Sequence, residues 1–144
     1  MNQIPIGQLL LQGFRWFDAS LLKSLKARGW PEQTRPQSML FANLDIESGT
    51  RSSELARRIG VSRQAVHQTV RELEALNLVQ LAPDPSNQSA KLVQLTDRGL
   101  KIVGDAIRVF TAIEKQLGDR IGEDNIVLLR QVLEEDWGSP IGGD

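Results

Sequence analysis

Polar side chains suited to bonding nucleic acid gather on one side of a predicted helix that begins at Ser62 and ends near Leu76. Helical residues rotate by about 100° each, which places three apolar residues together: Val66, Val70 and Leu73. The opposite side carries Gln64, Gln68 and Arg71, flanked by Arg63 and His67. Glutamine can bond adenine twice, arginine can bond guanine twice, and a helix N-terminus can receive a phosphate. An ordinary amphipathic helix with a solvated polar face shows the same pattern, so the neighbouring elements must decide.

The segments on either side of this helix predict a helix-turn-helix followed by a β-hairpin. Ser52 is expected to cap a short helix that buries Leu55, Ala56 and Ile59, and Gly60 is expected to make the turn. Ser62 caps the next helix, and Asn77 suits the left-handed position after it. Strands are expected over residues 78–81 and 91–95, because residues 83–87 are dense in turn formers. In such a motif the second helix enters the major groove of DNA.

Four further helices are predicted around this unit, over residues 6–28, 36–48, 96–117 and 123–135. Pro36 fits a first turn, and Thr96 can cap the helix that it precedes. The helix after residue 96 is apolar over about half its circumference, through Leu100, Val103, Ile107, Phe110 and Leu117 on one stripe and Ile102, Ala106, Val109 and Ile113 beside it. A one-sided surface helix needs an arc of only about 100°. The excess predicts a helical homodimer interface, and a thicker monomer core is the alternative.

Other kinds of chemistry find little support in the composition. The chain has no cysteine and a single histidine, His67, which excludes disulfides, cysteine-zinc sites and histidine clusters for metals. Neither a GxGxxG nor a GxxxxGK[ST] phosphate loop is present, so no enzyme activity and no cofactor are predicted. No segment has the roughly 20 apolar residues of a membrane helix, and no basic residue precedes Leu9 as in a signal peptide. We therefore expect a soluble cytoplasmic protein with no membrane partner.

Charge is distributed unevenly although the formal net charge is only −1. Residues 51–71 contain five arginines against the single acid Glu54, whereas residues 119–144 contain seven acids against Arg120 and Arg130. A basic middle segment on a nearly neutral chain indicates a local footprint for an anionic partner. Uneven surface charge is common, so this signal adds only modest weight.

The segment from about Ser52 to Gly99 resembles the MarR family of bacterial transcription regulators. The resemblance is carried, in order, by Ser53-Glu54-Leu55-Ala56, Gly60-Val61-Ser62, Val66, Leu73-Glu74, Leu78-Val79, Asp84-Pro85 and Leu95-Thr96-x-x-Gly99. The family implies a homodimer that binds a pseudo-palindromic operator and a repression that a small aromatic or phenolic ligand relieves. This sequence departs from the family in the wing, where Asn87-Gln88-Ser89 stands in place of the usual Asp-Arg-Arg run and Leu81 in place of an arginine on the preceding strand. Lys91 is the cation that remains there.

Aromatic residues on or near the first two predicted helices are candidates for a ligand pocket: Phe14, Trp16, Phe17, Trp30 and Phe41. Residues at such spacing more often form a core than a ligand cage. Arg15 or Arg35 could neutralise an acidic ligand.

The sequence thus predicts a mainly α fold with a small β-hairpin wing, in which a winged helix-turn-helix is flanked by N- and C-terminal dimerisation helices. We expect a single domain over residues 1–144, with DNA binding in residues 34–99 and dimerisation through residues 1–30 and 100–144. The predicted DNA-binding residues are Ser52, Ser62, Arg63, Gln64, His67, Gln68, Arg71, Gln88 and Lys91. The predicted function is a sequence-specific, homodimeric repressor released by a small ligand. The alternative is a winged-helix protein with weakened DNA binding that acts through a protein partner.

Overall fold

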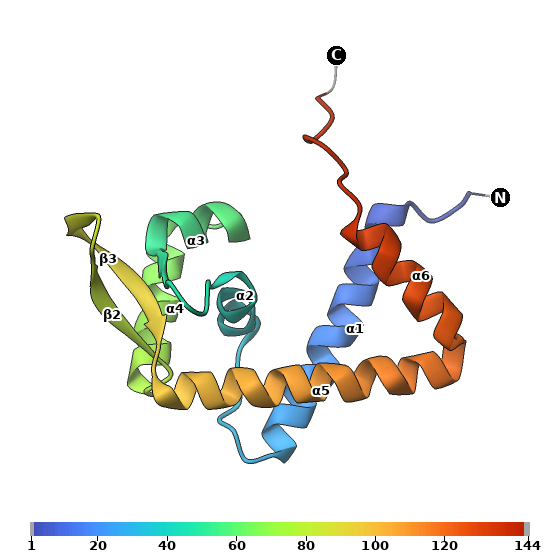
Figure 1. Ribbon diagram of the computed structural model, residues 1–144, viewed down its shortest axis with the longest axis horizontal. Coiled ribbons are helices and arrows are strands. Elements are labelled where there is room, and N and C mark those ends of the chain that lie inside the picture. The colour runs from blue at the N-terminus through green and yellow to red at the C-terminus, as the bar shows by residue number, and fades with distance from the viewer. Residues whose placement is uncertain (1, 143–144) are drawn as a thin grey trace. The chain divides into compact units, whose positions relative to one another are not determined.

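The computed structural model describes residues 2–142, and the chain divides into two compact units, Met1–Val109 and Phe110–Asp144. The first unit contains α1 (Ile6–Ala27), α2 (Arg35–Asn43), β1 (Thr50–Arg51), α3 (Ser52–Ile59), α4 (Arg63–Ala75), β2 (Val79–Asp84) and β3 (Asn87–Leu95) (Figure 1). Helix α5 (Asp97–Ile121) crosses the boundary, and α6 (Glu123–Glu134) lies in the second unit. The prediction of a mainly α fold with a small β wing is confirmed. Within residues 2–142, no helix combines the length and the apolar character needed to cross a bilayer.

The helix-turn-helix of α3 and α4 has the local signals that the sequence predicted, with one exception. Gly60 is left-handed at φ 79°, the Ser62 hydroxyl accepts a hydrogen bond from the Ala65 N–H at 3.0 Å, and Asn77 has φ 56°. The prediction that Ser52 caps α3 is wrong, because Arg51 occupies the N-cap position and no side chain caps the helix. The reason is that Arg51 is still extended as it pairs with Leu92 in the sheet, so Ser52 is already the first helical residue.

Helix α2 ends at Asn43 and not at Ser48, because the backbone of Leu44 is extended and its side chain is buried. The following loop folds back on itself: the Asp45 N–H donates to the Thr50 hydroxyl at 2.9 Å, and that hydroxyl donates to Asp45 Oδ2 at 3.2 Å. Gly49 lies at φ 72°, and a Cβ there would lie 2.7 Å from Gln94 Cγ and 2.9 Å from the Val93 carbonyl oxygen. This loop delivers residues 50–51 to the sheet.

The sheet has three antiparallel strands in the order β1-β3-β2, so the predicted hairpin gains an edge strand. Strand β1 pairs Thr50 with Val93 and Arg51 with Leu92. The hairpin is also longer than predicted, because only Pro85 and Ser86 separate the two strands and the ladder resumes at the Asp84–Asn87 pair after a bulge. We call β2 and β3 with their connecting turn the wing.

The core of the first unit lies where α2, α3 and α4 meet the sheet, through Leu40, Leu55, Val66, Leu73, Leu78 and Val93. The end of α4 is held by the start of α5: Thr96 Oγ1 donates to the Asn77 carbonyl at 2.6 Å, and the Thr96 N–H donates to the Leu78 carbonyl at 3.1 Å. Thr96 also caps α5 by accepting from the Gly99 N–H at 3.0 Å, as predicted.

The loop between α1 and α2 is tied to α5 within the same unit. The Trp30 indole donates to Asp105 Oδ2 at 2.7 Å, and the Arg98 guanidinium lies 5.5 Å from the centre of the Trp30 ring. Arg98 also donates to the Leu76 carbonyl at the end of α4. These contacts connect the loop after α1 with α5 and with the end of α4 through three side chains, Trp30, Asp105 and Arg98.

The second unit is formed by the end of α5 and by α6, joined at Gly122 with φ 103°. Arg130 pairs with Glu114, and a Cβ at Gly118 would lie 3.6 Å from Ile126 Cγ1, so the two helices contact each other. None of the residues of α6 is buried. Its large apolar side chains Val127, Leu128, Leu129, Val132 and Leu133 are between 41% and 57% exposed.

Candidate nucleic-acid interface

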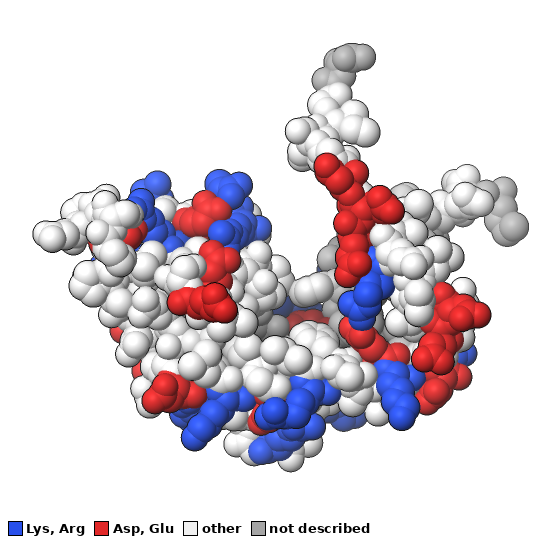
Figure 2. Space-filling view, in the orientation of Figure 1, with Lys and Arg blue, Asp and Glu red and all other residues white. Residues whose placement is uncertain are grey.

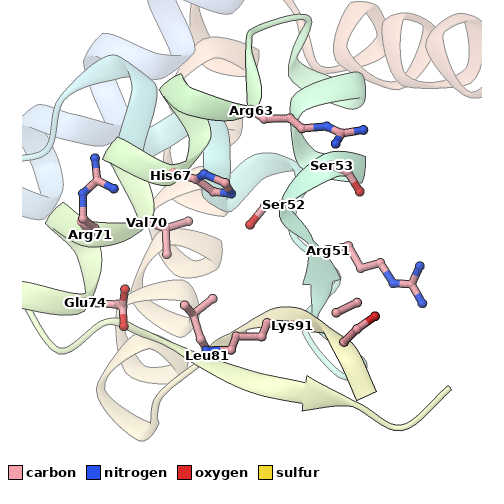
Figure 3. A pocket seen from close by; sticks show the side chains of 12 residues that line it. Arg51, Ser52, Ser53, Arg63, His67, Val70, Arg71, Glu74, Leu81 and Lys91 are labelled. Atoms are coloured by element: carbon pink, nitrogen blue, oxygen red, sulfur yellow. The ribbon is translucent and has the colours of Figure 1, made fainter. Parts of the chain in front are cut away.

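A groove of about 460 Å³ lies between the start of α3, the exposed side of α4 and the wing (Figure 3). Four cationic side chains line it: Arg51, Arg63, Arg71 and Lys91. Ser52, Ser53, Ser89 and His67 add polar groups, and Glu74 is the one acid among the lining residues. Val70, Leu81 and Ala90 supply an apolar surface. The arrangement offers cations and hydroxyls on both sides of a hollow, which suits the phosphates of a nucleic acid.

The structure brings five of the nine predicted DNA-binding residues together in this groove: Ser52, Arg63, His67, Arg71 and Lys91. The predicted division of α4 is confirmed, because Val66, Val70 and Leu73 are buried whereas Gln64, His67, Gln68 and Arg71 are exposed. Ser62, Gln64, Gln68 and Gln88 are exposed too, but they do not line the groove. The polar surface of α4 therefore has a part that faces the wing and a part that faces away from it.

Gln68 links two neighbours on the exposed surface of α4. Its side-chain oxygen accepts from Arg71 Nη2 at 2.8 Å, and its amide donates to Glu72 Oε1 at 3.2 Å. Glu72 in turn accepts from the amide of Gln37 on α2 at 3.0 Å. These bonds orient Gln68 and Arg71 before any partner arrives.

Two groove residues, Arg51 and Ser53, were not among the predicted DNA-binding residues. Arg51 counted toward the basic segment, but nothing in its sequence context indicated which way its side chain points. Its position follows from the pairing of β1 with β3, a two-residue strand too short to show a periodic pattern. Ser53 is an exposed residue in the first turn of α3.

The arginines of α3 are paired with acids, unlike those of α4. Glu54 accepts from both Arg57 and Arg58, and the hydrogen bond from Arg57 is the main reason that the pKa of Glu54 falls to about 2. Arg58 also donates to Asp45 Oδ2 at 3.1 Å and to the Asn43 carbonyl at 2.8 Å. Figure 2 shows basic and acidic side chains side by side over α3. Among the described residues, Arg63, Arg71 and Lys91 form no salt bridge.

The aromatic candidates for a ligand pocket do not form a closed core in this chain. Phe14 is 41% and Trp16 38% exposed, so the core interpretation is wrong for these two within one chain. Trp16 packs edge-on against Phe17 at 5.1 Å, and Phe17, Trp30 and Phe41 are partly buried.

The two arginines considered for an acidic ligand have different surroundings. Arg35 Nε lies 3.6 Å from the buried Asp18 Oδ2, so an acid of the chain already neutralises it. The other oxygen of Asp18 accepts from the Ser38 hydroxyl at 2.5 Å. Arg15 is exposed on α1.

Comparison with known proteins identifies the family. The family model described as MarR family matches residues 34–88, which include α2, α3, α4 and the start of the wing. The chain is 30% identical over 118 residues to the HTH-type transcriptional regulator TcaR of Staphylococcus aureus (strain Newman), covering 81% of this chain and 76% of TcaR. The chain belongs to the MarR family of winged-helix transcription regulators.

Two further comparisons support this assignment, one by sequence and one by fold. The HTH-type transcriptional repressor NicR of Pseudomonas putida is 26% identical over 112 residues, which cover 74% of this chain and 70% of NicR. The crystal structure of CouR from Rhodococcus jostii RHA1, bound to p-coumaroyl-CoA, superposes with a TM-score of 0.69 at 23% identity and covers 95% of each chain. This MarR-family chain therefore has the family fold over nearly its whole length. The prediction of a regulator rather than an enzyme agrees with the family.

Proposed function

We propose that this MarR-family protein is a cytoplasmic, homodimeric, sequence-specific repressor that leaves its DNA when a small aromatic or phenolic ligand binds. The observation that carries the proposal is the groove beside α4, which four cations line and where the outer side of α4 is polar and exposed. Residues 34–99 would bind the DNA, and residues 1–30 and 100–144 would form the dimer.

In this proposal α4 enters the major groove, as the second helix of a helix-turn-helix does. Gln64, Gln68 and Arg71 would bond base edges, because they lie on the side of α4 opposite the buried Val66 and Leu73. The remaining predicted residues would hold the backbone phosphates or sugars: Ser52, Ser62, Arg63, His67, Gln88 and Lys91. The Ser62 cap uses the Ala65 N–H, so the preceding amides of Arg63 and Gln64 would be the ones to meet a phosphate.

Dimerisation is supported by apolar side chains on α1 and α6 that one chain leaves exposed. Leu9, Leu11, Phe14 and Trp16 on α1 are between 38% and 49% exposed, and the apolar residues of α6 are exposed to a similar extent. Exposed apolar surface on each of these helices is typical of an interaction site. The predicted wide arc on α5 is divided: Ile102, Val109 and Ile113 are buried in the chain, whereas Leu100 and Ile107 are exposed. A second copy would cover the exposed helices.

Ligand-controlled repression is supported by what two relatives do. NicR is named a repressor, and CouR was crystallised with p-coumaroyl-CoA, which carries a phenolic acyl group. The partly exposed aromatic side chains Phe14, Trp16 and Trp30 are suited to stack on such a group.

The test is a binding titration of the protein with the DNA upstream of its own coding sequence. Arg71→Ala and Gln64→Ala should each weaken specific binding by about 1–3 kcal/mol, or about 5- to 150-fold, and leave the fold intact since neither residue is buried. Arg120→Ala, at the end of α5, is the control for loss of an exposed arginine. Unchanged affinity in both α4 variants would refute the assignment of this face. Failure of the wild type to bind duplex DNA would favour the alternative of a protein partner.

A further inference from the structure

Arg51 brings a cation to the tip of the wing from outside the wing. It is the last residue of β1, which is the edge strand on the side of β3 opposite to β2. Its guanidinium reaches across to the turn of the hairpin, where Nε and Nη2 both lie 2.5 Å from Asp84 Oδ2 and Nη2 donates to the Ser86 hydroxyl at 3.3 Å. The sequence has no arginine between Asp84 and Lys91. Tertiary structure therefore supplies a positive charge beside the wing turn, where the segment between Asp84 and Lys91 has none.

We propose that Arg51 contacts a DNA phosphate beside the wing and that Asp84 orients it for this contact. The proposal rests on the proposed function, since it names a further residue of the same DNA-binding surface. Arg51 lines the groove together with Arg63, Arg71 and Lys91, and 41% of its side chain is exposed. Figure 3 shows its side chain across the hollow from Arg71 of α4.

The donors of the guanidinium divide between the two partners. Nε and Nη2 form the edge that faces Asp84 and Ser86, whereas the two N–H groups of Nη1 take part in neither of these contacts. Arginine has five N–H donors in a rigid plane, so one edge can hold a carboxylate while the opposite one bonds a phosphate. A lysine at this position would carry its three donors on one nitrogen and would have no second planar edge to direct at a phosphate.

Asp84 is built to hold this orientation. Its side chain is only 8% exposed, and its Oδ1 accepts both the Ser86 N–H at 2.9 Å and the Ser86 hydroxyl at 2.8 Å. These bonds from Ser86, with the one from Arg51, lower the pKa of Asp84, so the carboxylate stays charged. Because the carboxylate is fixed by the turn, the guanidinium that it binds is fixed as well, and its remaining donors lose little freedom when they meet a phosphate.

The experiment compares Arg51→Gln, Arg51→Lys and Asp84→Asn with the wild type in salt titrations on one operator fragment and one unrelated duplex. Each neutralised phosphate contributes about 0.9 to the slope of log affinity against log salt. Losing one contact in each protomer should make the slope of Arg51→Gln shallower by about 2, so that its affinity falls about 12-fold less than that of the wild type between 50 and 200 mM salt. The same change should appear on both duplexes, because a phosphate carries no sequence information.

The other variants separate a DNA contact from a purely structural tether. Arg51→Lys keeps the charge and should keep the slope while binding more weakly. Asp84→Asn removes only the acid and should keep the slope or steepen it. Arg57→Gln, which removes an exposed arginine already paired with Glu54, should leave the slope unchanged.

The outcomes distinguish this inference from the proposed function. If the wild type binds the operator and Arg51→Gln has the same slope, Arg51 does not contact DNA and this inference alone is overturned. If Arg51→Gln and Asp84→Asn weaken binding equally with unchanged slopes, the pair is only a tether and the inference is likewise overturned. If the wild type binds no duplex, the proposed function itself fails.

Discussion

Adding an arginine beside the turn of the wing should steepen the salt dependence of DNA binding. Gln88 is the natural position, because it is exposed and lies two residues after the Pro85–Ser86 turn. It is also one of the positions where the sequence departs from the arginine pattern of its family. Gln88→Arg would place a further cation near Arg51, at the end of the wing where β2 and β3 are joined by their turn.

The magnitude follows from the cations that line the groove. Arg71 is assigned to base edges, so each protomer contributes Arg51, Arg63 and Lys91, and a dimer bound through both grooves would neutralise about six phosphates. The wild-type slope of log affinity against log salt should then be about −5, and affinity should fall about 10³-fold between 50 and 200 mM salt. Gln88→Arg adds two contacts in the dimer, which gives a slope of about −7 and a loss of about 10⁴-fold.

The assay is fluorescence anisotropy of a labelled operator fragment at four or more salt concentrations. Gln80→Arg is the matched control, because this substitution adds the same charge, and the side chain of residue 80 points to the face of β2 opposite to the groove-lining Leu81. Equal slopes for Gln88→Arg and the wild type would mean that the wing tip does not reach DNA. A wild-type slope near −9 would refute the count in another way, because it would require Arg57 and Arg58 to leave their acids and bind phosphates.

Three other substitutions test individual contacts. In Gly99→Ala the new Cβ would lie 2.0 Å from the Leu78 carbonyl oxygen, so α5 must shift, and thermal melting should show a loss of about 1–3 kcal/mol in the free energy of unfolding. The control Gly104→Ala, where the new Cβ has no neighbour closer than 3.8 Å, should lose little stability. The pKa of Glu54 is lowered from 4.5 to about 2, so its ion pairs stabilise the fold above pH 4.5 and are lost as the pH falls toward 2. The urea midpoint of Glu54→Gln should therefore depend less on pH over that range than the midpoint of the wild type, and the same pH dependence in both proteins would contradict this. Leu128→Asp on the exposed face of α6 should convert the dimer to a monomer in sedimentation, whereas the control Ile46→Asp, also at an exposed apolar residue but in the loop after α2, should stay a dimer. A dimer in both variants would mean that α6 is not part of the interface.

The sequence alone determined the elements of the DNA-binding unit and the two faces of α4. Val66, Val70 and Leu73 are buried as their spacing predicted, and Gly60, Ser62, Asn77 and Thr96 have the conformations or bonds expected of them. All of these signals act between residues close in the chain. A helical repeat, a cap or a left-handed turn depends on about four neighbouring residues, so each of these features can be predicted from a short stretch of sequence.

Tertiary structure decided which charged residues are available to a partner. The five arginines of residues 51–71 are alike in the sequence, yet Arg57 and Arg58 are paired with Glu54 while Arg63 and Arg71 line an open groove. Tertiary contacts also explain why α2 ends at Asn43 and why Arg51 is the N-cap of α3, both of which differ from the prediction. The loop between the two helices adds an edge strand to the sheet. Arg51 and Asp84 are 33 residues apart, and they meet only because β1 and β2 pair with opposite edges of β3. Such a contact depends on the register of two strand pairs at once, and no short window of sequence contains both.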